Sequence, residues 1–447
     1  MNPHAALLLI RPGRASARIA ALQIVASCIT TLLTFGVAML ASAFWTARTD
    51  EIGYRALAFG LVVLLIVPLI TLGAASARLA VRSRDARLAT LRLLGAASRS
   101  VRLLALAEVG VIAALGVLAG TVLALGLPFG LSLLTVHGAP LRASELWLPW
   151  GVSASIPLAL VAIAVLSALH GLRRVVLSPL GVRTRQEAPT MSWIRLVVAV
   201  VVVGAAALVT QLVSPGWGLV VLLGALTAVV LAVMGVLGLV GPFVVALVAR
   251  WIVERSSDPA WLIAARGLLE DPRAAWRSVS TLALTTCILI PAASLLGYVD
   301  TISRSISREV MRPDQLLLIS DARVLLLALA AVSFLVVAYQ AAMTQTVEVL
   351  EHEELYVALD RIGMRRQAIN VMRRRRVAAA ASVAVVGAAV ASVVLAFPVV
   401  ATGIATAPVF SAAILLVLCV GPLVAWMGVM LTEPVLTRAL GAPGRGE

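Results

Sequence analysis

Two short segments of the sequence combine an apolar stripe with charged flanks, and each ends at a glycine. In the segment ELYVALDRIGM, residues 354–364, the apolar side chains recur at i, i+4 and i+7, which places them on one face of a helix: Leu355, Leu359 and Ile362. The segment RLATLRLLGA, residues 87–96, has a weaker stripe between arginines: Leu88, Leu91 and Leu94, with Arg87 and Arg92. Gly95 and Gly363 follow where a helix end favours positive φ. Each segment is therefore predicted to be a short amphipathic helix followed by a glycine turn.

Such a helix needs something to cover its apolar stripe, and two occupants are open. Short amphipathic helices with arginine flanks commonly lie in the membrane interface. The alternative is a partner protein, and the presence of two similar segments on one chain favours it, because two equivalent helices suit two copies of one partner. We therefore expect a protein partner to cover the apolar stripe of both segments. The arginines beside the stripes are expected to contact membrane lipids.

Other chemistry is disfavoured by the residue types present. The chain has no lysine, so it cannot carry the Gly-Lys-Ser/Thr loop that cradles nucleotide phosphates, and any ATP hydrolysis has to reside in another chain. The four histidines lie in four different segments, without a metal-ligand pattern or a nucleophile with its base. We expect no catalytic residue, no metal and no cofactor in this chain, and the dispersed arginines disfavour nucleic acid.

The elements that must position these segments are predicted to be membrane helices. The chain has 447 residues, is 61% hydrophobic and 13% charged, and its mean hydropathy is +1.05. Uncharged runs long enough to cross a hydrocarbon core of about 30 Å predict an all-α polytopic protein with ten spans: 19–45, 55–77, 107–134, 148–170, 193–213, 217–249, 278–299, 322–345, 377–398 and 406–432. The turn sequence SPGWG at 214–218 divides the long uncharged stretch between the fifth and sixth spans.

The placement of the 36 basic residues, all of them arginine, orients these spans. If both termini are cytoplasmic, only seven arginines lie in outer loops, as the positive-inside rule expects. One outer segment, DTISRSISREVMRPDQ, repeats its arginines every four residues and is predicted to be an amphipathic helix on the outer leaflet that ends before Pro313: Arg304, Arg308 and Arg312. These arginines are expected to contact lipid phosphates or, alternatively, an anionic amphiphile or lipid-bound peptide.

The order of the elements indicates an internal duplication. Arginine pairs four residues apart precede the first and seventh spans: Arg14 and Arg18, and Arg273 and Arg277. The two amphipathic segments align with a shift of 268 residues, and each follows the second span of a four-span unit. We therefore predict a four-two-four plan: a first repeat at 1–171, a cytoplasmic linker at 172–192, two connecting spans at 193–249 and a second repeat at 250–447.

With this plan and these segments, the chain resembles the FtsX-like permeases of ABC transporters. In that family a coupling helix of similar sequence lies between the second and third spans of a four-span unit. The resemblance is close at 87–96 and looser at 354–364. The four-two-four layout resembles the ten-span, bacitracin-efflux type, although the large extracellular domain usual there is missing. The resemblance implies that the ATPase is contacted by Arg87, Leu88, Leu91, Arg92, Leu94, Gly95, Glu354, Leu355, Leu359, Asp360, Ile362 and Gly363.

The resemblance also implies a function and a location. The expected protein is the permease subunit of an ABC transporter in the bacterial cytoplasmic membrane, driven by two copies of a separate ATPase that carries the ATP and Mg²⁺. Its expected cargo is a hydrophobic or amphiphilic compound, such as a peptide antibiotic, a drug or a lipid, moved outward. The alternative is a signalling scaffold that does not transport, and that relays the ATPase cycle to a sensor kinase or a cell-wall hydrolase.

Overall fold

The computed structural model describes residues 14–46, 54–62 without 56, 98–136, 139–177, 193–212, 219–304, 313–351 and 357–395 without 359, with a few further residues between 400 and 430. Its contacts divide the chain into two compact units. Unit 1 comprises Met1–Thr46, Leu69–Leu134 and Pro140–Arg183, and unit 2 comprises Ala47–Pro68, Thr135–Ala139 and Thr184–Glu447. Residues 54–62, which open the second predicted span, thus pack with unit 2.

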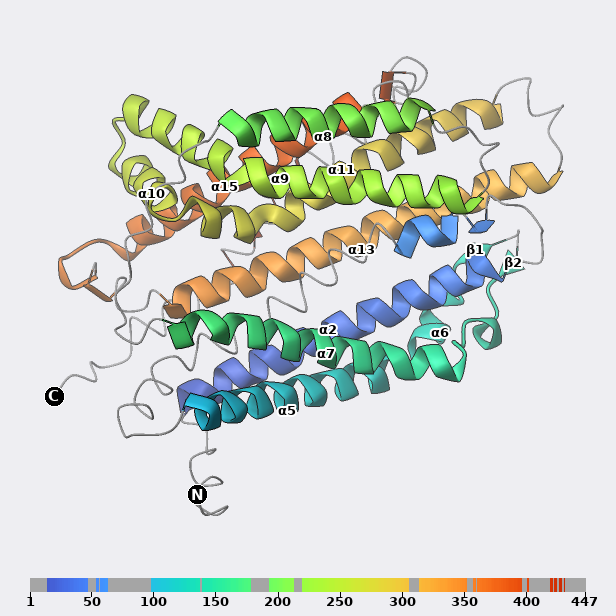
Figure 1. The fold of residues 1–447 in the computed structure, drawn as a ribbon, viewed down its shortest axis with the longest axis horizontal. Helices are drawn as coiled ribbons and strands as arrows, with labels where there is room; N and C mark the ends of the chain where they lie inside the picture. Colours follow the sequence, from blue (N-terminus) through green and yellow to red (C-terminus); the bar gives the residue numbers. More distant parts are fainter. Residues whose placement is uncertain are drawn as a thin grey trace, which may run out of the picture. The chain divides into compact units, whose positions relative to one another are not determined.

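The described part of unit 1 contains three long helices: α2 (Arg14–Trp45), α5 (Ser98–Ala124) and α7 (Trp150–Leu177) (Figure 1). Helix α5 packs against both α2 and α7. Its contact with α2 is very close, because a Cβ added at Gly116 would lie 2.6 Å from the Ile24 carbonyl oxygen, and one at Gly120 would lie 2.6 Å from that of Cys28. The absence of side chains at these two positions, four residues apart, lets the backbones touch.

The third span ends earlier than its apolar run predicts. Helix α5 stops at Ala124, whereas the uncharged run continues to 134. The sequence Gly126-Leu-Pro128 follows, and proline has no amide hydrogen with which to continue the helical ladder, so a separate short helix α6 (Leu127–Leu131) forms. Beyond it lie a 3₁₀ turn, η1 (Ala143–Glu145), and Leu146, which is fully buried among side chains of α2 that include Phe35 and Met39.

The described part of unit 2 includes the helices α8 (Trp193–Leu212), α9 (Leu219–Arg255), α10 (Pro259–Glu270), α11 (Pro272–Arg304), α13 (Pro313–Glu351) and α15 (Arg366–Leu395) (Figure 1). Helices α8 and α9 pack on each other on either side of the SPGWG sequence, as the predicted division of that stretch requires. Helix α11 packs against α9, α13 and α15. Strand β1 (Thr135–Val136) pairs with β2 (Ala139–Pro140) and contacts α13.

The core of unit 2 is made of small and medium side chains. Trp276 of α11 packs where Gly241 of α9 has no side chain, and a Cβ at Gly241 would overlap the indole ring. Ala384 and Ala388 of α15 are fully buried in the same core. The shift of 268 residues that aligns the two amphipathic segments places Gly116 on Ala384 and Gly120 on Ala388. The predicted duplication thus aligns the glycine pair of α5 with two small, buried residues of α15.

Proline starts three helices of unit 2, each at the first helical position where its missing amide costs nothing. Asp258 caps α10, accepting a hydrogen bond from the Ala260 amide at 2.9 Å. Asp271 does the same for α11, accepting from the Ala274 amide at 2.9 Å. Helix α10, a twelve-residue helix before α11, was not predicted, although its Asp-Pro start is visible in the sequence.

Six helices in the described part of the chain are long and apolar enough to cross a membrane: Ala20–Trp45, Ala105–Ala124, Trp150–Leu169, Ala232–Arg255, Ser320–Gln340 and Arg366–Val394. The chain is therefore an all-α, multi-pass membrane protein. The total of ten spans and the four-two-four plan stay predictions, since most residues of the second and tenth predicted spans lie outside the described ranges.

Candidate coupling site at the start of α15

The structure describes three of the twelve predicted coupling residues. Asp360, Ile362 and Gly363 lie within the described ranges. The remaining predicted residues lie outside them: Arg87, Leu88, Leu91, Arg92, Leu94, Gly95, Glu354, Leu355 and Leu359. The site can therefore be built only around the second segment, in unit 2.

The second segment ends in the predicted glycine turn. The Ile362 amide donates to the Ala358 carbonyl at 3.1 Å, which closes the last helical turn. The Gly363 amide donates to the Asp360 carbonyl at 3.0 Å, and Gly363 itself has φ of +93°. A residue with a Cβ is disfavoured in this conformation, so the prediction of a positive φ is confirmed for Gly363.

Ile362 is the described member of the predicted apolar stripe, and it is 82% exposed. An isoleucine side chain so exposed at the end of a short helix gains nothing from the fold of its own chain. The geometry thus leaves at least one apolar contact of this segment available to a partner.

The turn is connected to α15 by two residues and an ion pair. Met364 and Arg365 separate Gly363 from Arg366, where α15 begins. The Arg366 guanidinium lies 3.6 Å from the Asp360 carboxylate, across the turn. Both side chains are partly exposed, so the pair contributes at most about 1 kcal/mol to stability.

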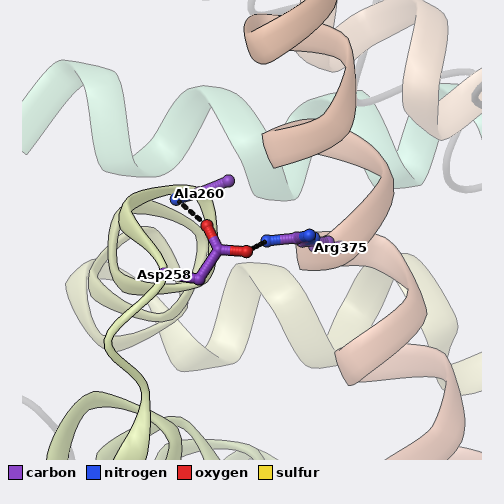
Figure 2. A network of polar contacts seen from close by, with 3 residues as sticks. All are labelled: Asp258, Ala260 and Arg375. Atoms are coloured by element: carbon purple, nitrogen blue, oxygen red, sulfur yellow. Dashed lines mark hydrogen bonds and ion pairs between the residues drawn. The ribbon is translucent and has the colours of Figure 1, made fainter.

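The next turns of α15 carry four consecutive arginines, residues 373–376, which contact several other elements. Figure 2 shows Arg375 forming an ion pair with the carboxylate of Asp258, the residue that caps α10. This hydrogen bond from Arg375, followed by that from the Ala260 amide, lowers the pKa of Asp258 below its usual value of 3.8. Sequence reasoning missed this pair, because nothing in the sequence relates positions 117 residues apart.

Tryptophans cover the arginines on their other sides. The Arg375 guanidinium lies over the Trp261 ring of α10, 5.3 Å from its centroid. Arg374 lies over the Trp426 ring at 5.6 Å. Arg–Trp stacking of this kind is favourable by about 0.5–1 kcal/mol where it is exposed to water. Arg373 is buried, at 3% exposure, so the arginine run is built into the structure instead of projecting into solvent.

Beyond the arginines, α15 is fixed to α11 by the unit 2 core. The Ser392 hydroxyl donates to the Cys287 carbonyl of α11 at 3.3 Å as well as to its own helix at Ala388. Together with the contacts of α10, these interactions join the start of α15, the cap of α10 and the apolar core. A displacement at Gly363 would therefore act on a helix with firm contacts to α10 and α11.

Of the three predicted outer arginines, only Arg304 lies within the described residues. Arg304 is the last residue of α11 and does not belong to a separate amphipathic helix, because the apolar helix continues through residues 300–304. Arg308 and Arg312 lie outside the described residues. Helix α13 begins at Pro313, the proline before which the amphipathic helix was predicted to end, and so it starts before the predicted span at 322–345.

Among the described residues, no group of three or more His, Cys, Asp or Glu side chains could hold a metal ion. Comparison with known proteins finds no family model and no curated protein that matches the chain.

Proposed function

We propose that the chain is the permease subunit of an FtsX-like ABC transporter in the bacterial cytoplasmic membrane. The observation that carries the proposal is the turn at Gly363: an exposed Ile362 ends a short helix, and a glycine with positive φ connects that helix to a membrane-spanning helix. A similar sequence at 87–96 also stands just ahead of a long apolar helix, α5, along the chain. Two such elements on one chain suit two copies of one ATPase.

In this proposal the ATPase supplies the energy and α15 transmits the motion. Closure of the ATPase pair displaces the short helix, and the Asp360–Arg366 pair and the two-residue link pass this displacement to α15. Because α15 is joined to α10 and α11, its displacement moves a group of helices together. The expected cargo is a hydrophobic or amphiphilic compound that enters from the bilayer and leaves outward.

The test is co-purification of the chain with the ABC ATPase encoded beside its gene. We expect a stable complex of two ATPase copies per chain, with turnover stimulated by peptide antibiotics or lipids. Ile362→Asp should weaken the complex at least about tenfold, since it puts a charge into a desolvated contact. The matched control is Ile263→Asp, because Ile263 on α10 is also exposed, at 42%, but lies outside the segment. A chain that binds no ATPase would contradict the proposal.

The same experiment distinguishes transport from the alternative function, a signalling scaffold. If the ATPase binds but no compound leaves ATP-loaded vesicles, and a sensor kinase or a hydrolase co-purifies with the complex, then the chain relays the ATPase cycle and transport is excluded.

A further inference from the structure

A buried polar contact lies in unit 2 near the start of α13. The Tyr54 hydroxyl donates a hydrogen bond to the Asp321 carboxylate at 2.7 Å. Tyr54 is 1% exposed and Asp321 is 2% exposed. Both residues belong to the parts of the chain that the charge bias places on the outer side of the membrane.

A carboxylate in such a place is costly to bury. Transfer of a charged group out of water is unfavourable unless hydrogen bonds replace the lost hydration, and charged residues within membrane spans are rarely present for stability alone. Asp321 falls inside the apolar segment Ser320–Gln340. A phenylalanine against a leucine would pack as well, so the polar pair needs a reason other than packing.

The two partners occupy nearly equivalent places in the two predicted repeats. Tyr54 opens the second span of the first repeat, and Asp321 lies at the start of the second span of the second repeat. The shift of 268 residues places Tyr54 on Ala322, the neighbour of Asp321. Each of these spans leads along the chain to one of the two amphipathic segments, at 87–96 and 354–364.

The surrounding residues hold both partners in place. On the first segment, the buried residues Tyr54, Ala58 and Leu61 recur at i, i+4 and i+7, so one helical face is packed. On α13, Ala322 and Leu325 are buried beside Asp321. The hydrogen bond therefore joins two packed helices, and on α13 it lies in the N-terminal part of the helix.

We propose that Tyr54 and Asp321 form an outer latch that holds the outer ends of these two spans together in the resting state. The latch opens when the amphipathic segments at the other ends of the same spans are displaced, and it reforms when they return. Its opening hydrates the carboxylate, which offsets the loss of the hydrogen bond. The link to displacement of these segments rests on the proposed function, whereas the latch itself does not.

The first experiment uses the permease alone, in nanodiscs. A background without Cys28, Cys287 and Cys419 carries Ala322→Cys as a reporter, and a hydrophilic maleimide measures its exposure. Tyr54→Phe should raise the labelling rate at least about tenfold, because the lost hydrogen bond to a charged acceptor favours the open state. Tyr339→Phe, the same change further along α13, should leave the rate unaltered. Ala58→Cys is the second reporter, on the opposite helix.

The result that overturns the latch is a labelling rate for Tyr54→Phe equal to that of Tyr339→Phe with both reporters. A lower melting temperature without faster labelling would likewise overturn it, since the pair would then only stabilise the fold.

The second experiment adds the ATPase, trapped with ATP and vanadate. Trapping should accelerate labelling in the chain with Tyr54 intact, and should add little in Tyr54→Phe, where the latch is already open. If the ATPase fails to bind, the proposed function fails while the first experiment still decides the latch. If the ATPase binds and trapping leaves the labelling rate unchanged, the link between latch and coupling segments is wrong.

Discussion

Gly363 shows how one residue sets the direction of a whole helix. Its φ of +93° lets the chain leave the short helix at 357–361 and enter α15 after two residues. L-residues other than Asn and Asp rarely adopt this conformation, at a cost of about 1–2 kcal/mol. The sequence predicted the turn because a glycine follows an amphipathic stripe, a purely local signal.

Gly363→Ala is therefore expected to lower the free energy of unfolding by about 1 kcal/mol. Under the proposed function, it should also reduce the stimulation of the ATPase by more than this loss accounts for. Gly363→Asn is the control, because asparagine tolerates positive φ and should retain most of the coupling. Thermal melting and ATPase assays of the complex measure both effects. If the alanine variant stimulates the ATPase as much as the original chain does, the turn has no role in transmitting motion.

The ion pair of Asp258 makes the stability of the fold depend on pH. Its pKa is lowered in the folded chain, first by the hydrogen bond from Arg375 and then by the Ala260 amide. The carboxylate thus stabilises the fold when ionised, and this contribution disappears as the pH falls below 3.8 through the lowered pKa. Asp258→Asn should melt at a slightly lower temperature than the original chain at neutral pH, since asparagine keeps the helix cap but loses the ion pair.

The difference in melting temperature should shrink as the pH is lowered below 3.8. Melting curves of both chains across this range are the measurement. A difference that stays constant with pH would show that the ion pair with Arg375 does not stabilise the fold. Asp258 would then act only as the cap of α10.

Among the elements, the contact between α2 and α5 leaves no room for a side chain at two positions. The absence of side chains at Gly116 and Gly120 allows backbone contact along two turns, and this is the close-packing device expected between membrane helices. The sequence contained the signal, a glycine pair four residues apart, but it could not say which helix fits against that face.

We expect Gly116→Ala and Gly120→Ala each to lower stability by about 1–3 kcal/mol, because the new Cβ would meet a backbone carbonyl that cannot move away alone. Gly110→Ala on the same helix is the matched control: its Cβ would lie 3.7 Å from a Val165 side-chain atom, an ordinary contact. Chemical denaturation in detergent measures the free energy of unfolding of the three variants. If Gly110→Ala is as harmful as Gly116→Ala, then the loss reflects a general intolerance of α5 to substitution and the close contact does not explain it.

At the scale of the whole molecule, the charge bias makes a prediction about topology. Ten spans with both termini cytoplasmic place residues 46–54 and 305–312 outside and residues 172–192 inside. Single cysteines at 48, 308 and 184, in a background without the three native cysteines, should therefore be labelled by an impermeant maleimide in intact cells only at 48 and 308. Labelling at 184 in intact cells would contradict the ten-span arrangement.

The membrane class, the helical fold and the turn at Gly363 could be predicted from the sequence, because each follows from local composition or from residues within a few positions of one another. Helix ends were predicted less well: α5 stops before Pro128, and α10 was missed because its twelve residues are too short for a span. The interactions of Asp258 with Arg375 and of Tyr54 with Asp321 depended on the tertiary structure, because each joins residues more than a hundred positions apart. Apolar patterns specify which faces are buried, but only the packed helices decide which buried polar groups meet.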